Sequence, residues 1–125
     1  MKKFALATAV SILLLPATTF AAEKKLKGAV YTPSAGVICD KKAGFCADSE
    51  GISMGFTKEY LGQAAQDKMM KLINDVGVSN FDTTWFVLSN GVACKTKEKA
   101  CTVSKIDNKV DAAHTKALFG SLPKK

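Results

Sequence analysis

A cassette of sixteen residues occurs twice in this chain, and its two copies contain all four cysteines. The copies read SAGVICDKKAGFCADS at 34–49 and SNGVACKTKEKACTVS at 89–104, and seven identities between them share an offset of 55 residues. We therefore expect one domain built from two related halves, about 29–77 and 81–120. Two copies are too few for a solenoid, so we expect the halves to pack about a pseudo-twofold axis.

The first residues resemble a secretory signal peptide. Lys2 and Lys3 precede an uncharged apolar run at 4–15, Pro16 ends the run, and Ala21 completes a small-residue cleavage site. The run is too short to cross a bilayer, and no second long apolar run follows it. We predict a signal peptide at 1–21, a single domain at 22–125 without a membrane span, and a periplasmic location, with the extracellular space as the alternative.

The charge pattern restricts the class of partner. All 18 basic residues are lysine, against 11 acids. Nucleic-acid readers rely on arginine forks, so we expect no nucleic-acid partner. The positive balance allows weak attraction to an acidic envelope protein or polymer, but composition alone favours the interpretation that surface lysines keep the protein soluble. The oligomeric state stays open.

Short strands are predicted around each cassette. Alternation and turn residues indicate strands at 29–32, 37–40 and 45–47, and again at 92–95 and 100–104. The segment 81–88, FDTTWFVL, has the composition of the best strand, and Asn90-Gly91 predicts a two-residue hairpin turn. We interpret 23–28 as a frayed charged leader and 48–56 as a loop.

One long amphipathic helix is predicted at about 57–76, capped by Thr57 and ended by Gly77. Gly62 weakens its first turn. Its apolar stripe predicts five buried residues, namely Leu61, Ala65, Met69, Leu72 and Ile73. A short helix is expected at 111–119, ended by Gly120. The fold class is therefore α+β, with two disulfide-pinned antiparallel β-meanders packed against the long helix and the short C-terminal helix.

Six residues separate the cysteines within each cassette. If a four-residue turn intervenes, the two cysteines face each other across a hairpin, so we expect Cys39–Cys46 and Cys94–Cys101. The alternative pairing links the two cassettes. The spacing is wider than a redox Cys-x-x-Cys or a zinc-binding pair, so a thiol redox or metal-handling protein is the weakest of three functional hypotheses.

The sequence shows no assembled catalytic set, and we assign no catalytic, cofactor or metal residue. The carboxylates Asp40, Asp48 and Glu50 support the second hypothesis, a small envelope hydrolase. His114 is the only histidine and is interpreted as a surface or cap residue. Tyr60 and Trp85 are interpreted as core residues.

The leading hypothesis is a non-enzymatic binding module. The cassettes differ most at their turns, DKKAGF at 40–45 and KTKEKA at 95–100. A shared framework with divergent tips is typical of a scaffold that displays interaction loops, although drift in exposed turns is the alternative. The candidate partner-binding residues are Lys41, Lys42, Lys95, Lys97 and Lys99.

The order of motifs resembles a known family. A signal peptide, GVICD, GIS and TKEYLG are followed by a second GVAC cassette and TKALFG. This arrangement, from about 30 to 120, resembles the YcgJ family, also called Fels prophage protein-like. The resemblance implies a small exported bacterial protein in a Gram-negative periplasm. It implies no catalytic residues.

Overall fold

A computed structural model describes residues 23–123, and the predicted signal peptide lies outside them. Sheet A is an antiparallel meander in which consecutive strands are neighbours: β1 (Lys24–Lys27), β2 (Val30–Ser34), β3 (Val37–Asp40), β4 (Phe45–Asp48) and β5 (Gly51–Ser53). Sheet B contains β6 (Trp85–Val87), β7 (Ala93–Lys95) and β8 (Ala100–Thr102).

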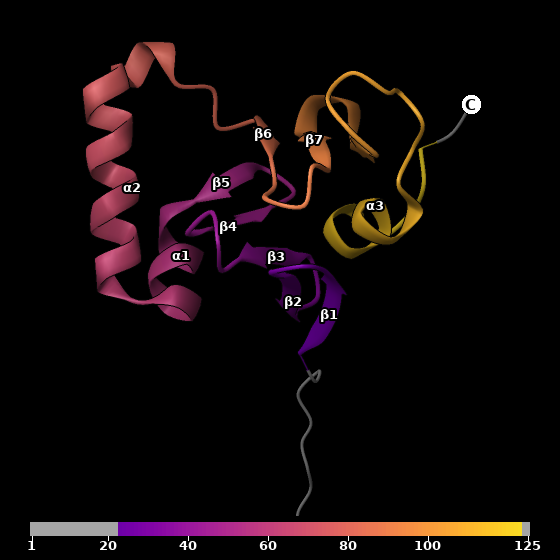
Figure 1. Ribbon diagram of the computed structural model, residues 1–125, viewed down its shortest axis with the longest axis horizontal. Helices are drawn as coiled ribbons and strands as arrows, with labels where there is room; N and C mark the ends of the chain where they lie inside the picture. Colours follow the sequence, from indigo (N-terminus) through magenta and orange to yellow (C-terminus); the bar gives the residue numbers. More distant parts are fainter. Residues whose placement is uncertain (1–22, 124–125) are drawn as a thin grey trace, which may run out of the picture.

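Three α-helices complete the fold: α1 (Met54–Leu61), α2 (Gln63–Val76) and α3 (Ala112–Phe119). Two short 3₁₀ helices are η1 (Val78–Asn80) and η2 (Thr96–Glu98). Sheet A lies in the middle of the molecule, with α2 at one side and with sheet B and α3 at the other (Figure 1). The predicted disulfide-pinned α+β fold is confirmed. No helix within 23–123 is long and apolar enough to cross a membrane.

Sheet A buries both of its faces. On one face, α1 contributes Phe56, Tyr60 and Leu61 to a cluster that contains the first disulfide. The opposite face packs against sheet B and α3 in the main core. There the Phe45 and Phe86 rings meet edge to face with centroids 5.7 Å apart, a favourable aromatic geometry. The residues of sheet A in this core are Val30, Ile38, Phe45 and Ala47.

The contact between the two halves joins faces that are not equivalent. Sheet A uses the face opposite its disulfide, whereas sheet B uses the face that contains Cys94 and Cys101. A twofold axis would bring identical faces together. The predicted pseudo-twofold packing is therefore wrong.

The predicted long helix is divided into α1 and α2 at Gly62, whose φ of +99° is accessible to glycine without strain. The chain enters α1 earlier than expected because Ser53, not Thr57, is the N-cap, and its hydroxyl accepts a hydrogen bond from the Phe56 N–H. Thr57 instead lies inside α1 and is fully buried.

Only part of the predicted apolar stripe is buried. Met69 is 6% exposed, but Leu61, Ala65 and Ile73 are half-buried. Leu72 is 47% exposed, so its predicted burial is wrong. The reason is that α2 lies beside sheet A and not across a face of it (Figure 1), so only a narrow line of the helix reaches the core.

Several strand predictions also change. The predicted leader forms the edge strand β1, where Lys24, Lys25 and Lys27 discourage pairing with other chains. The predicted loop at 48–56 contains β5 and the start of α1. Within 81–88 only three residues form a strand. The hairpin turn spans three residues, 89–91, because the Leu88 N–H donates to the Val92 carbonyl.

Candidate binding surface

Each cassette forms a hairpin closed by its own disulfide, as predicted. Cys39 is bonded to Cys46 and Cys94 to Cys101, with Cα atoms 4.0 Å apart in both pairs. A buried threonine from the following helix fixes each hairpin, because its hydroxyl accepts a hydrogen bond from the N–H of the second cysteine. The Thr57–Cys46 and Thr115–Cys101 distances are both 2.9 Å. The hairpin tips therefore project from rigid bases.

The second tip places two of its three lysines, Lys95 and Lys97, beside one tryptophan. Lys95 ends β7, and its Nζ lies 5.2 Å from the centre of the Trp85 ring and 3.9 Å from a carboxylate oxygen of Glu98. Lys97 and Lys99 are exposed on the turn, where Lys99 adopts a left-handed conformation with φ of +52°. This tip is a compact platform of cations beside an aromatic ring.

The first tip is held against the protein. Lys41 and Lys42 are exposed, but the Lys41 Nζ lies 4.9 Å from the centre of the Tyr31 ring. The backbone N–H of Lys42 donates to the Asp40 carboxylate. The aromatic ring beneath Lys41 is buried, so this tip offers charge without an accessible apolar surface.

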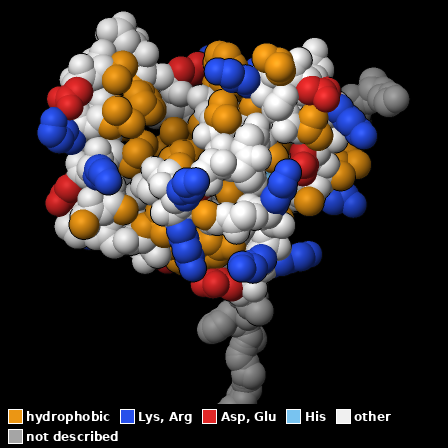
Figure 2. Space-filling model, viewed as in Figure 1, with side chains coloured by type: hydrophobic (Ala, Val, Ile, Leu, Met, Phe, Trp, Pro, Cys, Tyr) orange, Lys and Arg blue, Asp and Glu red, His pale blue; other side chains and the backbone are white. Residues whose placement is uncertain are grey.

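The five candidate lysines do not form one patch. Asp40 at the base of the first tip contacts Ser89, which precedes β7, whereas the second tip follows β7. The two tips therefore lie at opposite ends of this strand. In Figure 2, lysines are spread over the visible face among apolar side chains. The densest group of candidate lysines is therefore Lys95, Lys97 and Lys99, and a partner that requires clustered positive charge is expected to bind there.

Trp85 was interpreted as core, yet it is 48% exposed. It borders a hollow of about 200 Å³ that is also lined by Asp82, Thr84, Lys95, Lys97 and Glu98. The Thr84 hydroxyl and backbone N–H donate to Asp82 and lower its pKa, with a smaller effect of the Lys97 charge. The lining of this hollow therefore places carboxylates and lysine ammonium groups beside the Trp85 ring. The tryptophan-centred site was missed because residues 85–88, WFVL, are all apolar, so alternation does not show which of them face outward.

Asp40 is fully buried and links the two halves. Its carboxylate accepts hydrogen bonds from the backbone N–H groups of Lys42 and Ala43, and from both the N–H and the hydroxyl of Ser89. The Asp40–Ser89 distances are 2.6 and 2.8 Å. With these four donors Asp40 is a structural group with no access to a substrate.

The other two acids of the hydrolase hypothesis lie elsewhere. Asp40 pairs with Phe45 at one end of β4, whereas Asp48 pairs with Gly51 at the other end. The Asp48 carboxylate accepts a hydrogen bond from the Glu50 N–H, and Glu50 is exposed. The structure therefore does not bring the three carboxylates into one site.

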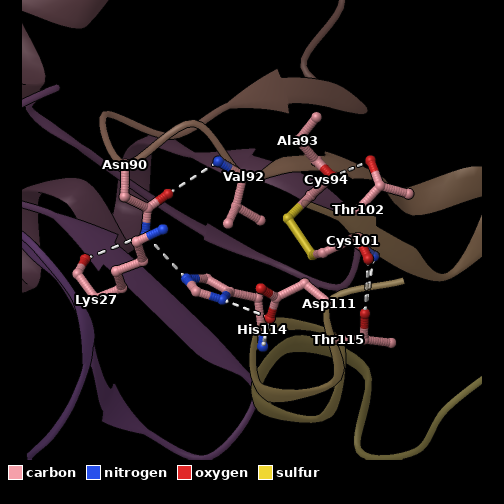
Figure 3. Close-up of polar contacts among 10 residues, drawn as sticks. All are labelled: Lys27, Asn90, Val92, Ala93, Cys94, Cys101, Thr102, Asp111, His114 and Thr115. Carbon is pink, nitrogen blue, oxygen red and sulfur yellow. Dashed lines mark hydrogen bonds and ion pairs between the residues drawn. A yellow bond between two sulfur atoms is a disulfide. The ribbon is translucent and has the colours of Figure 1, made fainter. Parts of the chain in front are cut away.

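His114 was expected to be a surface or cap residue. It is buried, and it lies in the first turn of α3, where its N–H donates to the N-cap Asp111. Figure 3 shows its ring between Asp111 and Asn90: Nδ1 lies 2.9 Å from the Asp111 carboxylate and Nε2 lies 3.0 Å from Nδ2 of Asn90. The Asn90 amide also donates to the Lys27 carbonyl and accepts from the Val92 N–H. An amide donor at Nε2 requires the neutral tautomer with its proton on Nδ1. This network joins β1, the β6–β7 turn and α3.

Asp111 has two roles in this network. It is the N-cap of α3, accepting from the His114 N–H at 2.9 Å, and it binds the His114 ring. Partial burial alone would raise the pKa of Asp111, but the two hydrogen bonds from His114 and the positive charge of Lys27 outweigh it. The pKa of Asp111 is therefore below its ordinary value.

Another hollow, of about 560 Å³, lies between the C-terminal end of α3 and the β2–β3 turn. Its lining includes Lys24, Ser34, Ser49 and Lys116. Among the described residues that line it there is no carboxylate, histidine or cysteine. This hollow thus offers hydroxyl groups and ammonium groups but no acid–base pair.

Residues 30–119 match the family described as YcgJ protein. The chain belongs to the YcgJ family. It is similar to "Uncharacterized protein YcgJ" of Escherichia coli (strain K12), with 33% identity over 99 residues that cover 74% of this chain and 75% of that protein. No solved structure matches the chain.

Proposed function

We propose that this YcgJ family member is a non-enzymatic interaction module of the cell envelope that binds an acidic protein or polymer through its hairpin tips. The observation that carries this proposal is the second tip, where Lys95 lies over the exposed Trp85 ring, Lys97 lines the same hollow, and Lys99 is exposed on the adjoining turn. The disulfide at the base of the tip pre-orders it and so lowers the entropic cost of association.

A periplasmic location after removal of 1–21 is part of the proposal. Two buried structural disulfides are typical of proteins in an oxidising compartment. The positions of the candidate acids and of His114 give the hydrolase alternative no support, since Asp40 and His114 are internal structural groups.

The test is capture of partners from a periplasmic extract at low and high salt. The baits are wild type, a variant with serine at 41 and 42, and a variant with serine at 95, 97 and 99. We expect the triple variant to lose salt-sensitive partners and the double variant to keep most of them. The matched control replaces three exposed lysines elsewhere, Lys58, Lys68 and Lys109, with serine. Equal retention by both triple variants would contradict binding through the tips.

A further inference from the structure

Six outward side chains of sheet B form two cross-strand rows, which we call the Trp85 face. The strand registers define the rows as Trp85–Lys95–Ala100 and Val87–Ala93–Thr102. Phe86, Cys94 and Cys101 alternate with them and point inward to the core. Trp85 and Val87 are 48% and 43% exposed, and Lys95, Ala100 and Thr102 are partly exposed, whereas Ala93 is only 2% exposed. Most of this face is therefore open to solvent.

The same rows exist in sheet A, where they are buried. The offset of 55 residues between the cassettes relates Trp85–Lys95–Ala100 to the register Val30–Asp40–Phe45. It likewise relates Ala93 and Thr102 to the pair Ile38 and Ala47. Sheet A packs these rows against sheet B and α3, and each of the five is 6% exposed or less. The face that forms the interface in sheet A is therefore the one left open in sheet B.

We propose that the Trp85 face docks a protein partner whose contact region is an apolar ridge flanked by carboxylates. This proposal rests on the proposed function, since it names the surface and the kind of acidic partner. Two differences between the sheets determine the chemistry of that partner.

The first difference is size. The positions of Ile38 and Phe45 in sheet A are Ala93 and Ala100 in sheet B. Ala93 and Ala100 form the floor of a hollow of about 250 Å³, whose lining also includes Val110 and Pro123. An apolar side chain on a partner would fill this hollow and cover Val87, and burial of that surface would favour binding.

The second difference is charge. Asp40 in sheet A accepts hydrogen bonds from Ser89, which lies in the β6–β7 turn that covers it. The equivalent residue in sheet B is Lys95, whose ammonium group can donate hydrogen bonds but cannot accept them. A layer that covers Lys95 must therefore supply an acceptor. The contact with Glu98 is 3.9 Å long and exposed, so it leaves the ammonium available. Lys97 and Lys99 extend the positive rim, which favours carboxylates at the edge of the partner surface.

Trp85 is the only tryptophan, so its fluorescence reports directly on this face. The probes are a helical peptide with leucines on one side and glutamates along both flanks, a twin with lysines for glutamates, and polyglutamate. We expect the acidic amphipathic peptide to shift the emission to shorter wavelength in a saturable way, and the other two to bind at least about tenfold more weakly. We expect Val87→Ser to weaken binding by about tenfold and Lys95→Glu by more. The matched controls, Val78→Ser and Lys71→Glu, change exposed residues on η1 and α2 and should have no effect.

The outcomes separate this proposal from the proposed function. If polyglutamate binds as well as the acidic peptide, acid recognition stands and apolar docking is wrong. If no acidic probe binds, even at low salt, both are wrong. A shift produced by a neutral glycan, or by raising the protein concentration alone, would overturn the proposal in favour of a sugar site or a second copy of this chain. Binding that Val87→Ser and Val78→Ser weaken equally would also overturn it.

Discussion

The backbone nitrogen of Ser89 lies 2.6 Å from the carboxylate of Asp40, which connects the tip of the first hairpin to the turn before the second cassette. Because the Ser89 hydroxyl donates to the same group, one buried side chain fixes the position of sheet B on sheet A. The acid that the sequence offers as a catalytic candidate thus determines how the halves pack.

This contact predicts a specific loss of stability. Asp40→Asn places an amide donor among four donors, so at least one buried N–H or O–H loses its acceptor. We expect a loss of about 2–3 kcal/mol in the free energy of unfolding, measured by urea denaturation. The control, Asp48→Asn, changes a carboxylate that accepts one exposed hydrogen bond and should cost less than about 1 kcal/mol. Equal effects would mean that Asp40 does not hold the interface.

The threonines beneath the hairpins give a paired prediction. Thr57→Val and Thr115→Val keep the shape of the side chain but leave the N–H groups of Cys46 and Cys101 without their acceptors. Each should lower stability by about 1–3 kcal/mol, whereas Thr57→Ser, which retains the hydroxyl, should recover most of the loss. Amide hydrogen exchange at Cys46 provides a local measurement. An exchange rate unchanged in Thr57→Val would exclude the proposed role of the hydroxyl.

Helix α2 provides a prediction that corrects the sequence-based one. Met69 is 6% exposed and Leu72 is 47% exposed. Met69→Asp buries a carboxylate and should cost about 3 kcal/mol or more, whereas Leu72→Asp should change stability by less than about 0.5 kcal/mol. Thermal unfolding of the two variants distinguishes the positions. A larger effect at Leu72 would place the opposite side of α2 against the core.

Local chemistry allowed the disulfides and α3 to be predicted, because the relevant partners are close in sequence. A hairpin of fixed length brings Cys39 to Cys46, and Asp111 and Gly120 mark the ends of α3. The amphipathic stripe of α2 indicated a buried side but not how much of it a neighbour covers, so Leu72 was assigned wrongly.

Contacts between residues far apart in the sequence, and the orientation of strands that are apolar on both faces, could not be predicted from local patterns. Asp40 meets Ser89 across 49 residues, and no local pattern indicates a buried acid. In the segment Trp85–Val87 every residue is apolar, so period-two alternation cannot tell which face is inward. Trp85 could be assigned to the exposed face only once the strand register of sheet B was known.

The Asp111–His114 pair predicts how stability depends on pH. The folded-state pKa of Asp111 is below its ordinary value, so the charged carboxylate stabilises the folded protein at pH values above the unfolded-state pKa of about 4. This contribution is lost as pH falls through the lower folded-state pKa, where the carboxylate becomes protonated. Asp111→Asn keeps an N-cap oxygen for the His114 N–H but has no charge at any pH. Wild type should therefore exceed this variant by about 0.3–1 kcal/mol above pH 5, and the difference should vanish toward pH 2. Urea denaturation from pH 2 to 6 measures both curves, and a difference that stays constant or grows on acidification would contradict the charged role of Asp111.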